Sequence, residues 1–598
     1  MQATLVRSLV AAAIGVPLFA QAPNKMPQTA EAMLPASTYA AARFGGLAAC
    51  RDATMALPLA PAVQAFLAKI PAEVRQQWLE DRLDQAAGEL QQQLQHAGLR
   101  PADVRGFLAR PMTLAVGRLS IEGMGPSVAL VVEVGEQRQA VNRMVQWGAG
   151  LVEQLAEGTQ RGEVDIGGHK FHTLASPETP TLFAGSLGDR YYVVSNSRGY
   201  VRDMIDVVAG KQASLVGSTR LVQLNAMLPA PALASWFLNT ERVLSAFAPH
   251  MPYETEDWCR ALGVGALDGV WAGYTANAEG GADVLHLGLQ GDEKGLLKAL
   301  VAAPADLSFA RACSANTVAF ASMSWDVPAV LDAFHRFAGL LPPAVRDEML
   351  REAGRELGRE LRHLGTLPQL DETLRAFGSQ FAFALALEKG AVPKPELLAR
   401  IAVRDGEKVL GLLQKFEALV AREAEVEWKT RKADGHEVRF CNVPLPQAEL
   451  QLSPCYVLTQ DALWFGSDVA ALVRALRQTE DECLAAQPDF QAAVKTAKDA
   501  SGLVFLRWSR AAEIGWRTIE TMAYPQLDAH KDEVGFGSEA LPDAETMAKA
   551  LGTSTMTWRV GDDGITLESR GTFTYGSLLA LLGMGFDEVL GRAGGKVY

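Results

Sequence analysis

Histidine is the side chain that most readily performs acid–base or metal chemistry near neutral pH, and this chain has two glycine–histidine turns. One has the sequence Gly168-His169-Lys170-Phe171-His172, and the other contains Gly435-His436. Strand residues three apart point to opposite faces, so His169 and His172 could bind one metal ion only if the strand carried a bulge. The sequence favours a turn or surface role for His169, His172 and His436, with metal binding or acid–base catalysis as the alternative.

Acidic side chains gather in three short segments that could offer oxygen ligands to calcium. They are Glu254, Glu256 and Asp257, then Glu480, Asp481 and Glu482, and finally Asp562 and Asp563. No EF-hand spacing accompanies them, and the sequence also lacks the H-E-x-x-H, G-x-S-x-G, P-loop and dinucleotide-binding signatures. Segment 531–545 contains two glycines but no preceding strand or basic residues suited to a phosphate, so it is predicted to be a mobile surface loop. We therefore assign no catalytic residue, no metal site and no cofactor from the sequence.

Four tryptophans are predicted to lie on comparable strands of two halves of the chain. They are Trp236, Trp271, Trp508 and Trp558. Large aromatic side chains stabilise cores far more often than they form carbohydrate-stacking platforms, so a core role is favoured and sugar binding is the alternative.

Six cysteines are spread along the chain, and none falls in a C-x-x-C motif. They are Cys50, Cys259, Cys313, Cys441, Cys455 and Cys483. Cys441 and Cys455 are predicted on neighbouring strands and Cys259 and Cys313 flank a domain junction, so each pair could form a disulfide. Sequence alone does not fix the connectivity.

The N-terminus has the pattern of a secretory signal peptide. Arg7 precedes an uncharged apolar run, Ser8–Phe19, and Ala20-Gln21-Ala22 provides a small-residue cleavage site. We expect cleavage after Ala22, a short linker over residues 23–33, and a periplasmic or secreted mature chain. No later stretch approaches the roughly 18 apolar residues of a transmembrane helix, so no such segment is expected in the mature protein.

Composition excludes several classes of protein. Apolar residues make up 48% of the 598-residue chain and charged residues 21%, which is globular, and the length implies more than one domain. The formal net charge is -13, which argues against a nucleic acid or an anionic membrane surface as partner.

An internal duplication is predicted from segments 70–117 and 341–387. Both begin with an Ile-Pro or Leu-Pro step, and Pro71, Val74 and Arg75 have counterparts in Pro342, Val345 and Arg346 at one constant offset. A repeat of this length is a whole domain rather than a solenoid unit. We expect two domains, residues 34–305 and residues 308–598.

Each copy is predicted to contain the same elements in the same order. Apolar runs bounded by Gly or Pro, such as 112–119 and 128–134 in the first copy and 381–387 and 398–403 in the second, indicate buried strands. Helical periodicity follows, at 137–155 and 407–420. Short turns between strands imply antiparallel pairing. The predicted fold class is α+β, with two tandem copies of a mainly antiparallel sheet and helices packed on one face of each.

The chain resembles a group of exported bacterial proteins known as domain of unknown function 3352. The resemblance rests on the opening Leu34-Pro35-Ala36-Ser37-Thr38, the strand-rich body, a Ser-Leu element before a short helix, and the signal peptide. It covers both copies, although Ser314 and Ala315 replace the opening Leu and Pro in the second. It implies export and supplies no catalytic residues.

Three functional hypotheses follow. The first is an exported, non-catalytic binding or interaction module that contacts a protein or an apolar small molecule. The second is a carrier of a lipid or other apolar ligand, which needs an apolar cavity of roughly 300 Å³ or more. The third is a hydrolase with His and carboxylate side chains converging between the two copies.

Overall fold

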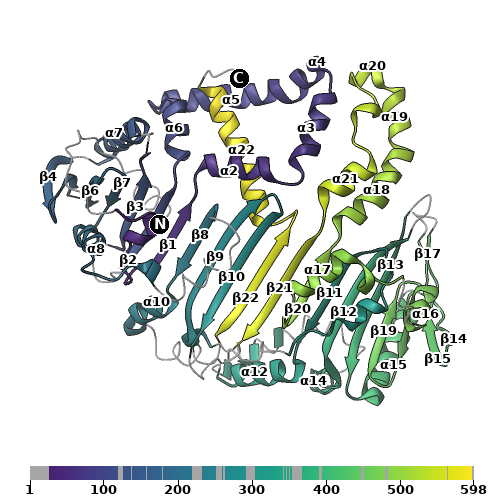
Figure 1. Cartoon of the computed structure of the whole chain (residues 1–598). Coiled ribbons are helices and arrows are strands. Elements are labelled where there is room, and N and C mark those ends of the chain that lie inside the picture. The colour runs from purple at the N-terminus through teal and green to yellow at the C-terminus, as the bar shows by residue number, and fades with distance from the viewer. Residues whose placement is uncertain are drawn as a thin grey trace.

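The computed structural model describes residues 26–594 apart from 119–124, 136–137, 157, 178, 218–231, 251–258, 260–262, 291–302, 341–342, 345, 349–350, 353–366, 389–392, 424, 446–449, 478–481 and 562. The predicted signal peptide, the acidic segment 254–257 and most of the predicted helix 350–364 lie outside the described residues. Helices and strands are mixed and the strands pair antiparallel, as the sequence predicts, but the strands form one large sheet instead of a separate sheet in each half (Figure 1).

Ten strands of the first half pair antiparallel in one continuous order. From the outer edge inward they are β4 (Gln160–Ile166), β5 (His169–Ser176), β6 (Thr179–Leu187), β7 (Tyr191–Ser195), β3 (Ser127–Glu133), β2 (Met112–Arg118), β1 (Ala40–Phe44), β8 (Ala234–Leu238), β9 (Leu267–Asn277) and β10 (Gly280–Leu289).

Ten strands of the second half follow the same connectivity. From the other outer edge inward they are β14 (Lys429–Ala433), β15 (His436–Phe440), β18 (Cys455–Leu458), β19 (Ala462–Gly466), β13 (Lys394–Val403), β12 (Phe377–Glu388), β11 (Thr317–Ser324), β20 (Gly502–Leu506), β21 (Ser554–Gly561) and β22 (Gly564–Gly571). A separate small hairpin pairs β16 (Val443–Leu445) with β17 (Leu450–Leu452).

The two halves join where β10 pairs antiparallel with β22, which makes one 20-stranded sheet. Val284 pairs with Glu568, and each is the fifth residue of its strand. Gly280 and Gly564 begin these strands with φ values of 109° and 145°. A Cβ on Gly280 would lie 2.5 Å from the Gly571 carbonyl oxygen, and one on Gly564 would lie 2.1 Å from the Leu287 carbonyl oxygen. The seam therefore requires glycine at both ends.

The helices of the first half connect these strands. They are η1 (Ala30–Met33), α2 (Leu47–Ala56), α3 (Ala60–Lys69), α4 (Ala72–Arg75), the π-helical η2 (Gln76–Glu80), α5 (Asp81–His96), α6 (Pro101–Leu108), α7 (Arg138–Leu155), α8 (Arg198–Val208), η4 (Leu215–Gly217), α10 (Thr240–Phe247), η5 (Ala248–His250) and η6 (Val264–Ala266).

The second half has a comparable set of helices. They are η8 (Leu307–Arg311), α12 (Val327–Leu340), α14 (Leu367–Leu374), α15 (Gly406–Glu423), α16 (Val469–Arg477), η9 (Leu484–Ala486), α17 (Pro488–Thr496), α18 (Trp508–Met522), α19 (Tyr524–Ala529), α20 (Lys531–Val534), η10 (Ser538–Ala540), α21 (Ala544–Leu551) and α22 (Tyr575–Ala593).

Helices cover both faces of the sheet, so the prediction of one covered face was wrong. In the first half α8 packs on the face that carries Val131 and Val193. On the other face α7 packs against Val132 and Val194. The second half has the same arrangement, with α16 in one core cluster and α15 in the other. The physical reason lies in strands such as β7, in which all five residues are apolar or small and all are buried, because both of their faces need cover.

The structure also corrects three predictions about short segments. Trp508 begins α18 rather than lying on a strand. Segment 531–545 is not a loop, since it contains α20, η10 and the start of α21. Within the predicted linker 23–33, Ala30 and Met33 are buried in the core of the first half, so the described part of that segment belongs to the folded domain.

Candidate functional site

The structure places the three candidate histidines on strands at opposite ends of the sheet. His169 begins β5 and pairs with Ile166, and His436 begins β15 and pairs with Ala433. Both follow a glycine turn, so they occupy equivalent positions in the two halves. Each strand is second from an outer edge of the sheet, and most of the 20 strands lie between them (Figure 1). His436 therefore cannot share a site with His169 or His172.

Within the first half, His169 and His172 are half-buried side chains on β5. Burial lowers the pKa of both imidazoles, while Asp165 opposes this shift at His169 and Glu163 opposes it at His172. Nδ1 of His172 lies 3.6 Å from the exposed carboxylate of Glu163. In the part of the chain that the structure describes, no group of three or more His, Cys, Asp or Glu side chains is placed to hold a metal ion.

The predicted disulfides do not form among the described residues. Cys455 pairs with Phe440 in the β15–β18 ladder, whereas Cys441 donates its N–H to Pro454. The two cysteines are one position out of register, and such neighbours point to opposite faces. Burial raises the pKa of the Cys455 thiol to about 12. Both members of the other predicted pair, Cys259 and Cys313, are reduced.

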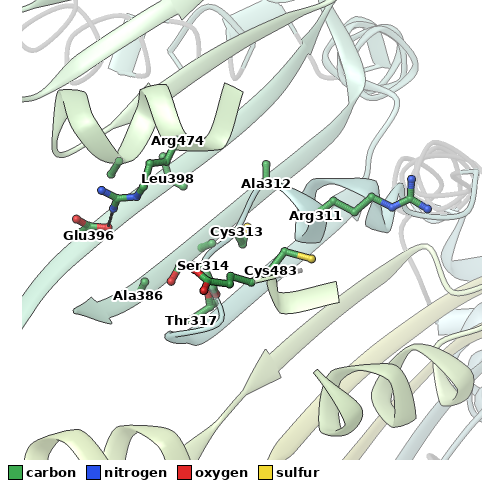
Figure 2. Close-up of a pocket in the computed structure, with 13 residues that line it drawn as sticks. Arg311, Ala312, Cys313, Ser314, Thr317, Ala386, Glu396, Leu398, Arg474 and Cys483 are labelled. Carbon is green, nitrogen blue, oxygen red and sulfur yellow. Dashed lines mark hydrogen bonds and ion pairs between the residues drawn. The ribbon is translucent and has the colours of Figure 1, made fainter. Parts of the chain in front are cut away.

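A small, partly open pocket of about 100 Å³ lies in the second half (Figure 2). Figure 2 shows Glu396 paired with Arg474 on one side, at 2.6 Å, and Cys313 and Cys483 on the other. Cys483 forms an antiparallel bridge with Ser314, the residue after Cys313. Both cysteines are reduced, and burial together with the nearby Cys483 raises the pKa of the Cys313 thiol. The pocket can hold a few water molecules but no larger ligand.

Two other hollows lie in the same half. One, partly open, has a volume of about 190 Å³ and is lined by Arg400 and Trp464. The other is an open depression of about 640 Å³ beside Trp428, which is lined by Glu417, Glu425 and Glu427 and is therefore acidic. Neither of these described hollows is an enclosed apolar cavity of the size that the carrier hypothesis requires.

A buried histidine at the seam was not identified from the sequence. His286 of β10 is 4% exposed, and its Nδ1 lies 2.7 Å from Oγ1 of Thr566 on β22. Its ring stacks on Trp271 with 4.4 Å between centroids. Burial lowers the pKa of the imidazole, and the nearby Asp563 and Asp268 oppose that shift. The site joins the two halves but is closed to substrate, so we interpret it as structural.

The described surface is most unusual at the C-terminal helix α22, which is fixed firmly to the first half. Its N-terminal N–H groups at Tyr575 and Gly576 donate to the buried carboxylate of Asp283 on β10, at 2.6 and 2.8 Å. Burial raises the pKa of the Asp283 carboxyl, although these two N–H groups favour its charged form. At the other end Asp587 accepts two hydrogen bonds from Arg105 of α6, at 2.7 and 2.8 Å. The helix is thus held at both ends.

The inward face of α22 consists of small residues that allow close approach. Gly576, Ala580 and Gly583 are directed at the protein, and Ala580 is fully buried. A Cβ on Gly576 would lie 2.1 Å from the carbonyl oxygen of Thr275. A Cβ on Gly583 would lie 2.5 Å from Cβ of Cys50 on α2. The helix backbone therefore rests directly on β9 and α2.

The outward face of α22 carries the large apolar side chains, which is the reverse of an ordinary surface helix. We call the exposed residues Tyr575, Leu578, Leu581, Leu582 and Phe586 the α22 ridge. Leu578 is 52% exposed, Leu582 64% and Phe586 44%. Together the ridge side chains expose on the order of 500 Å² of mostly apolar surface, which is within the range of the largest patches on monomeric proteins. Such patches often mark binding sites.

One helix near α22, α3, is also largely apolar and has no buried residue. Figure 1 shows α2, α3, α4 and α5 following a loop, with α22 in yellow along its remaining side. The α2 and α5 helices pack against α22, whereas α3 packs against α2 and α21. None of the ten residues of α3 is buried, and Val63 is 44% exposed although the helix is largely apolar. The apolar sides of α3 and α22 therefore do not cover each other.

The sequence contains a signal for this ridge, although no helix is predicted over these residues. Residues 571–586 carry no charge. Within them large apolar residues stand at 575, 578, 579, 581, 582, 584 and 586, and the residues between them are the small Gly576, Ser577, Ala580, Gly583 and Gly585. Periodicity predicts one apolar helix face from this pattern but does not tell which side faces the protein. The close approach of Gly576 to β9 and of Gly583 to α2 shows which side faces the protein.

Comparisons with known proteins found no match among family models, curated proteins or solved structures. The resemblance to domain of unknown function 3352 stays a prediction. No helix among the described residues, α22 included, combines the length and apolar character that crossing a membrane requires.

Proposed function

We propose that the protein is an exported, non-catalytic binding protein, built from two copies of one domain, whose binding surface is the α22 ridge. The observation that carries this proposal is a helix fixed at both ends that directs its small residues inward and its large apolar residues to solvent. A loosely attached helix could rotate and expose apolar residues without any functional reason. The hydrogen bonds to Asp283 and from Arg105 to Asp587 fix the orientation of α22, so its apolar face stays exposed.

The proposed duplication is supported by the pairing of the strands in the two halves. β1 lies between β2 and β8 in the first half, and β11 lies between β12 and β20 in the second. The bridge between Pro35 and Ser214 has a counterpart between Ser314 and Cys483. The β10–β22 seam pairs equivalent strands about Val284 and Glu568, as a twofold axis would. Two copies of one domain account for all three observations.

A non-catalytic role is supported by the separation of the reactive groups. His169 and His436 lie in different halves, and His286 is buried behind Trp271. A hydrolase between the copies would need His and carboxylate side chains that converge in an accessible cleft. The seam instead contains the buried cluster of His286, Thr566 and Trp271, which a substrate cannot reach.

The proposal is tested by native mass spectrometry on the mature protein isolated from the exported fraction of its own host. We compare the wild type with the ridge variant Leu578→Gln/Leu582→Gln and with the matched control Leu374→Gln/Leu410→Gln, whose leucines are 42% and 44% exposed on α14 and α15. We expect a copurifying mass in the wild type and the control that is missing from the ridge variant. A bare wild type, or the same mass on all three proteins, would contradict the proposal.

Export is tested in the same preparation. N-terminal sequencing is expected to begin at Pro23, the residue after the predicted cleavage site. A chain that keeps Met1 and stays in the cytoplasm would show the signal-peptide prediction to be wrong.

A further inference from the structure

Two cysteines of the second half lie close together although they are far apart in the sequence. Cys313 follows η8, and Cys483 immediately precedes η9. Cys483 forms an antiparallel bridge with Ser314, and the Leu484 N–H donates to the Cys313 carbonyl oxygen at 2.9 Å. Opposite residues of such a bridge have Cα atoms about 4.5–5.5 Å apart, so one further chain step places the Cα atoms of the two cysteines about 5–6.5 Å apart. A disulfide joins Cα atoms that are about 4.4–6.8 Å apart.

Both cysteines line the same pocket beside η8 (Figure 2). Sγ of Cys313 donates to the carbonyl oxygen of Phe309 in η8, at 3.2 Å. Ser214 occupies the position of Cys483 in the first half, and its Oγ donates to the carbonyl oxygen of Ala32 in η1, at 2.8 Å. Because η1 precedes the first bridge as η8 precedes the second, a side chain at this position points to the short helix before its bridge.

The pocket supplies space for an S–S bond and shields it from solvent. Joining the sulfurs requires rotation of the side chains between staggered rotamers, and the pocket of about 100 Å³ that both cysteines line leaves room for this movement. Cys313 is 2% exposed and Cys483 is 4% exposed. Burial, with a smaller contribution from Cys483, raises the pKa of the Cys313 thiol. Because the thiolate is the reactive form, the folded protein should exchange thiols slowly in either direction.

The first half has the same packing of short helices without a pair of thiols. η1 packs against η4 there, as η8 packs against η9 in the second half. The positions of Cys313 and Cys483 are occupied by Leu34 and Ser214. The fold therefore does not need cysteine at these positions, and the thiol pair distinguishes the second half.

We propose that Cys313 and Cys483 are the site of a disulfide, which forms when the chain meets an oxidant and which the structure shows in its reduced state. Both thiols lose their protons, and the two sulfurs together lose two electrons as one S–S bond forms. The oxidant is a disulfide of a protein or of a small thiol such as glutathione, and its own S–S bond breaks to give two thiols. The new bond ties η9 to the segment that leads into β11. This inference does not depend on the α22 ridge.

The first test maps the cysteines of the full mature chain, isolated from the exported fraction without reductant and denatured in iodoacetamide. We expect the tryptic peptides 312–336 and 478–495 to be joined, with a mass two hydrogen atoms below their sum.

Cys441 and Cys455 provide the internal control, because 14 positions separate them whereas 170 separate the proposed pair. Loop-closure entropy in an unfolded chain favours the nearer pair about 40-fold. Linkage of Cys313 to Cys483 while Cys441 and Cys455 are alkylated therefore reports the folded geometry.

A second test starts from the reduced, folded protein in a glutathione redox buffer and does not depend on export. We expect the same two peptides to become joined, and dithiothreitol to reduce the bond roughly tenfold or more faster in urea than in native buffer. The variant Cys483→Ser introduces the residue that the first half has at this position, so it should keep its circular dichroism spectrum and leave Cys313 alkylated. The joined pair in either test supports the proposal. Alkylation of both cysteines in both tests, or linkage of either one to another cysteine, would overturn it.

Discussion

Replacing Gly576 with alanine tests the inverted orientation of α22 through the sign of the stability change. In an ordinary helix this substitution stabilises, because alanine is favoured over glycine by up to about 1 kcal/mol. Here the added Cβ would lie 2.1 Å from the carbonyl oxygen of Thr275 and 2.9 Å from its carbonyl carbon and its nitrogen. These are backbone atoms of the central strand β9, so no side chain can move aside. The start of α22 must shift instead.

The size of the expected loss in unfolding free energy follows from the hydrogen bonds that this shift would weaken. Cβ and oxygen need roughly 1 Å more separation to reach a tolerable contact. A displacement of this size lengthens the hydrogen bonds that Tyr575 and Gly576 donate to Asp283, now 2.6 and 2.8 Å. A hydrogen bond to a charged group contributes about 1.5–3 kcal/mol, and Asp283 would remain buried. We expect Gly576→Ala to lower the free energy of unfolding by about 3 kcal/mol.

The same helix offers a matched control. A Cβ on Gly585 would meet no heavy atom within 4 Å, so Gly585→Ala is expected to stabilise by about 0.5–1 kcal/mol. Urea unfolding of the full chain, followed by circular dichroism, compares the midpoints of both variants with that of the wild type. The two substitutions should move the midpoint in opposite directions. A Gly576→Ala midpoint at or above that of the wild type would mean that α22 does not rest on β9, and the outward ridge would lose its basis.

Three further predictions concern groups away from the ridge. Asp587→Asn weakens the two charge-assisted bonds from Arg105 and should lower the free energy of unfolding by about 2–3 kcal/mol, measured by the same urea titration. Burial holds the pKa of His286 below its unfolded value near 6.5, so stability is complete above about pH 6.5 and declines as the pH falls below it. His286→Gln should make the unfolding midpoint change less between pH 7.5 and pH 5, and an unchanged slope would contradict the assignment. Cys441 and Cys455 should both react with iodoacetamide when the protein is denatured without reductant, and mass spectrometry would reveal a disulfide if one protects them.

Much of the sheet could be predicted because its strands are bounded locally. The apolar runs at 112–119 and 128–134 coincide closely with β2 and β3, and the helix at 137–155 with α7. Gly or Pro at the ends of such runs marks where a strand must stop. The turn of the hairpin β21–β22 lies between Gly561 and Gly564, a sequence signal of the same local kind. These features depend on residues close in sequence.

The features that the sequence did not reveal depend on residues far apart. Trp508 continues an apolar strand pattern, yet β20 ends at Leu506 and α18 begins at the tryptophan. His286 gains its role from Thr566, 280 positions along the chain. The second covered face of β7 does have a local signal, its run of five apolar or small residues, but that run does not tell which helices provide the cover. Propensity and periodicity describe the local chain, and the contact between His286 and Thr566 is not local.

The proposed duplication accounts for the scaffold, but the segment that forms the ridge differs in sequence from the segment that follows β10. After β22 the chain continues for 15 residues, 572–586, without a charge, whereas after β10 it continues with Gly291-Asp292-Glu293-Lys294. The equivalent segments have therefore diverged where the strand order has not. Selection that acted only on stability would keep polar residues on the solvent side of α22, because exposed apolar surface brings an aggregation hazard. Retention of five large apolar side chains on a helix that is already fixed by Asp283 and Asp587 is explained if that surface is covered when the protein acts.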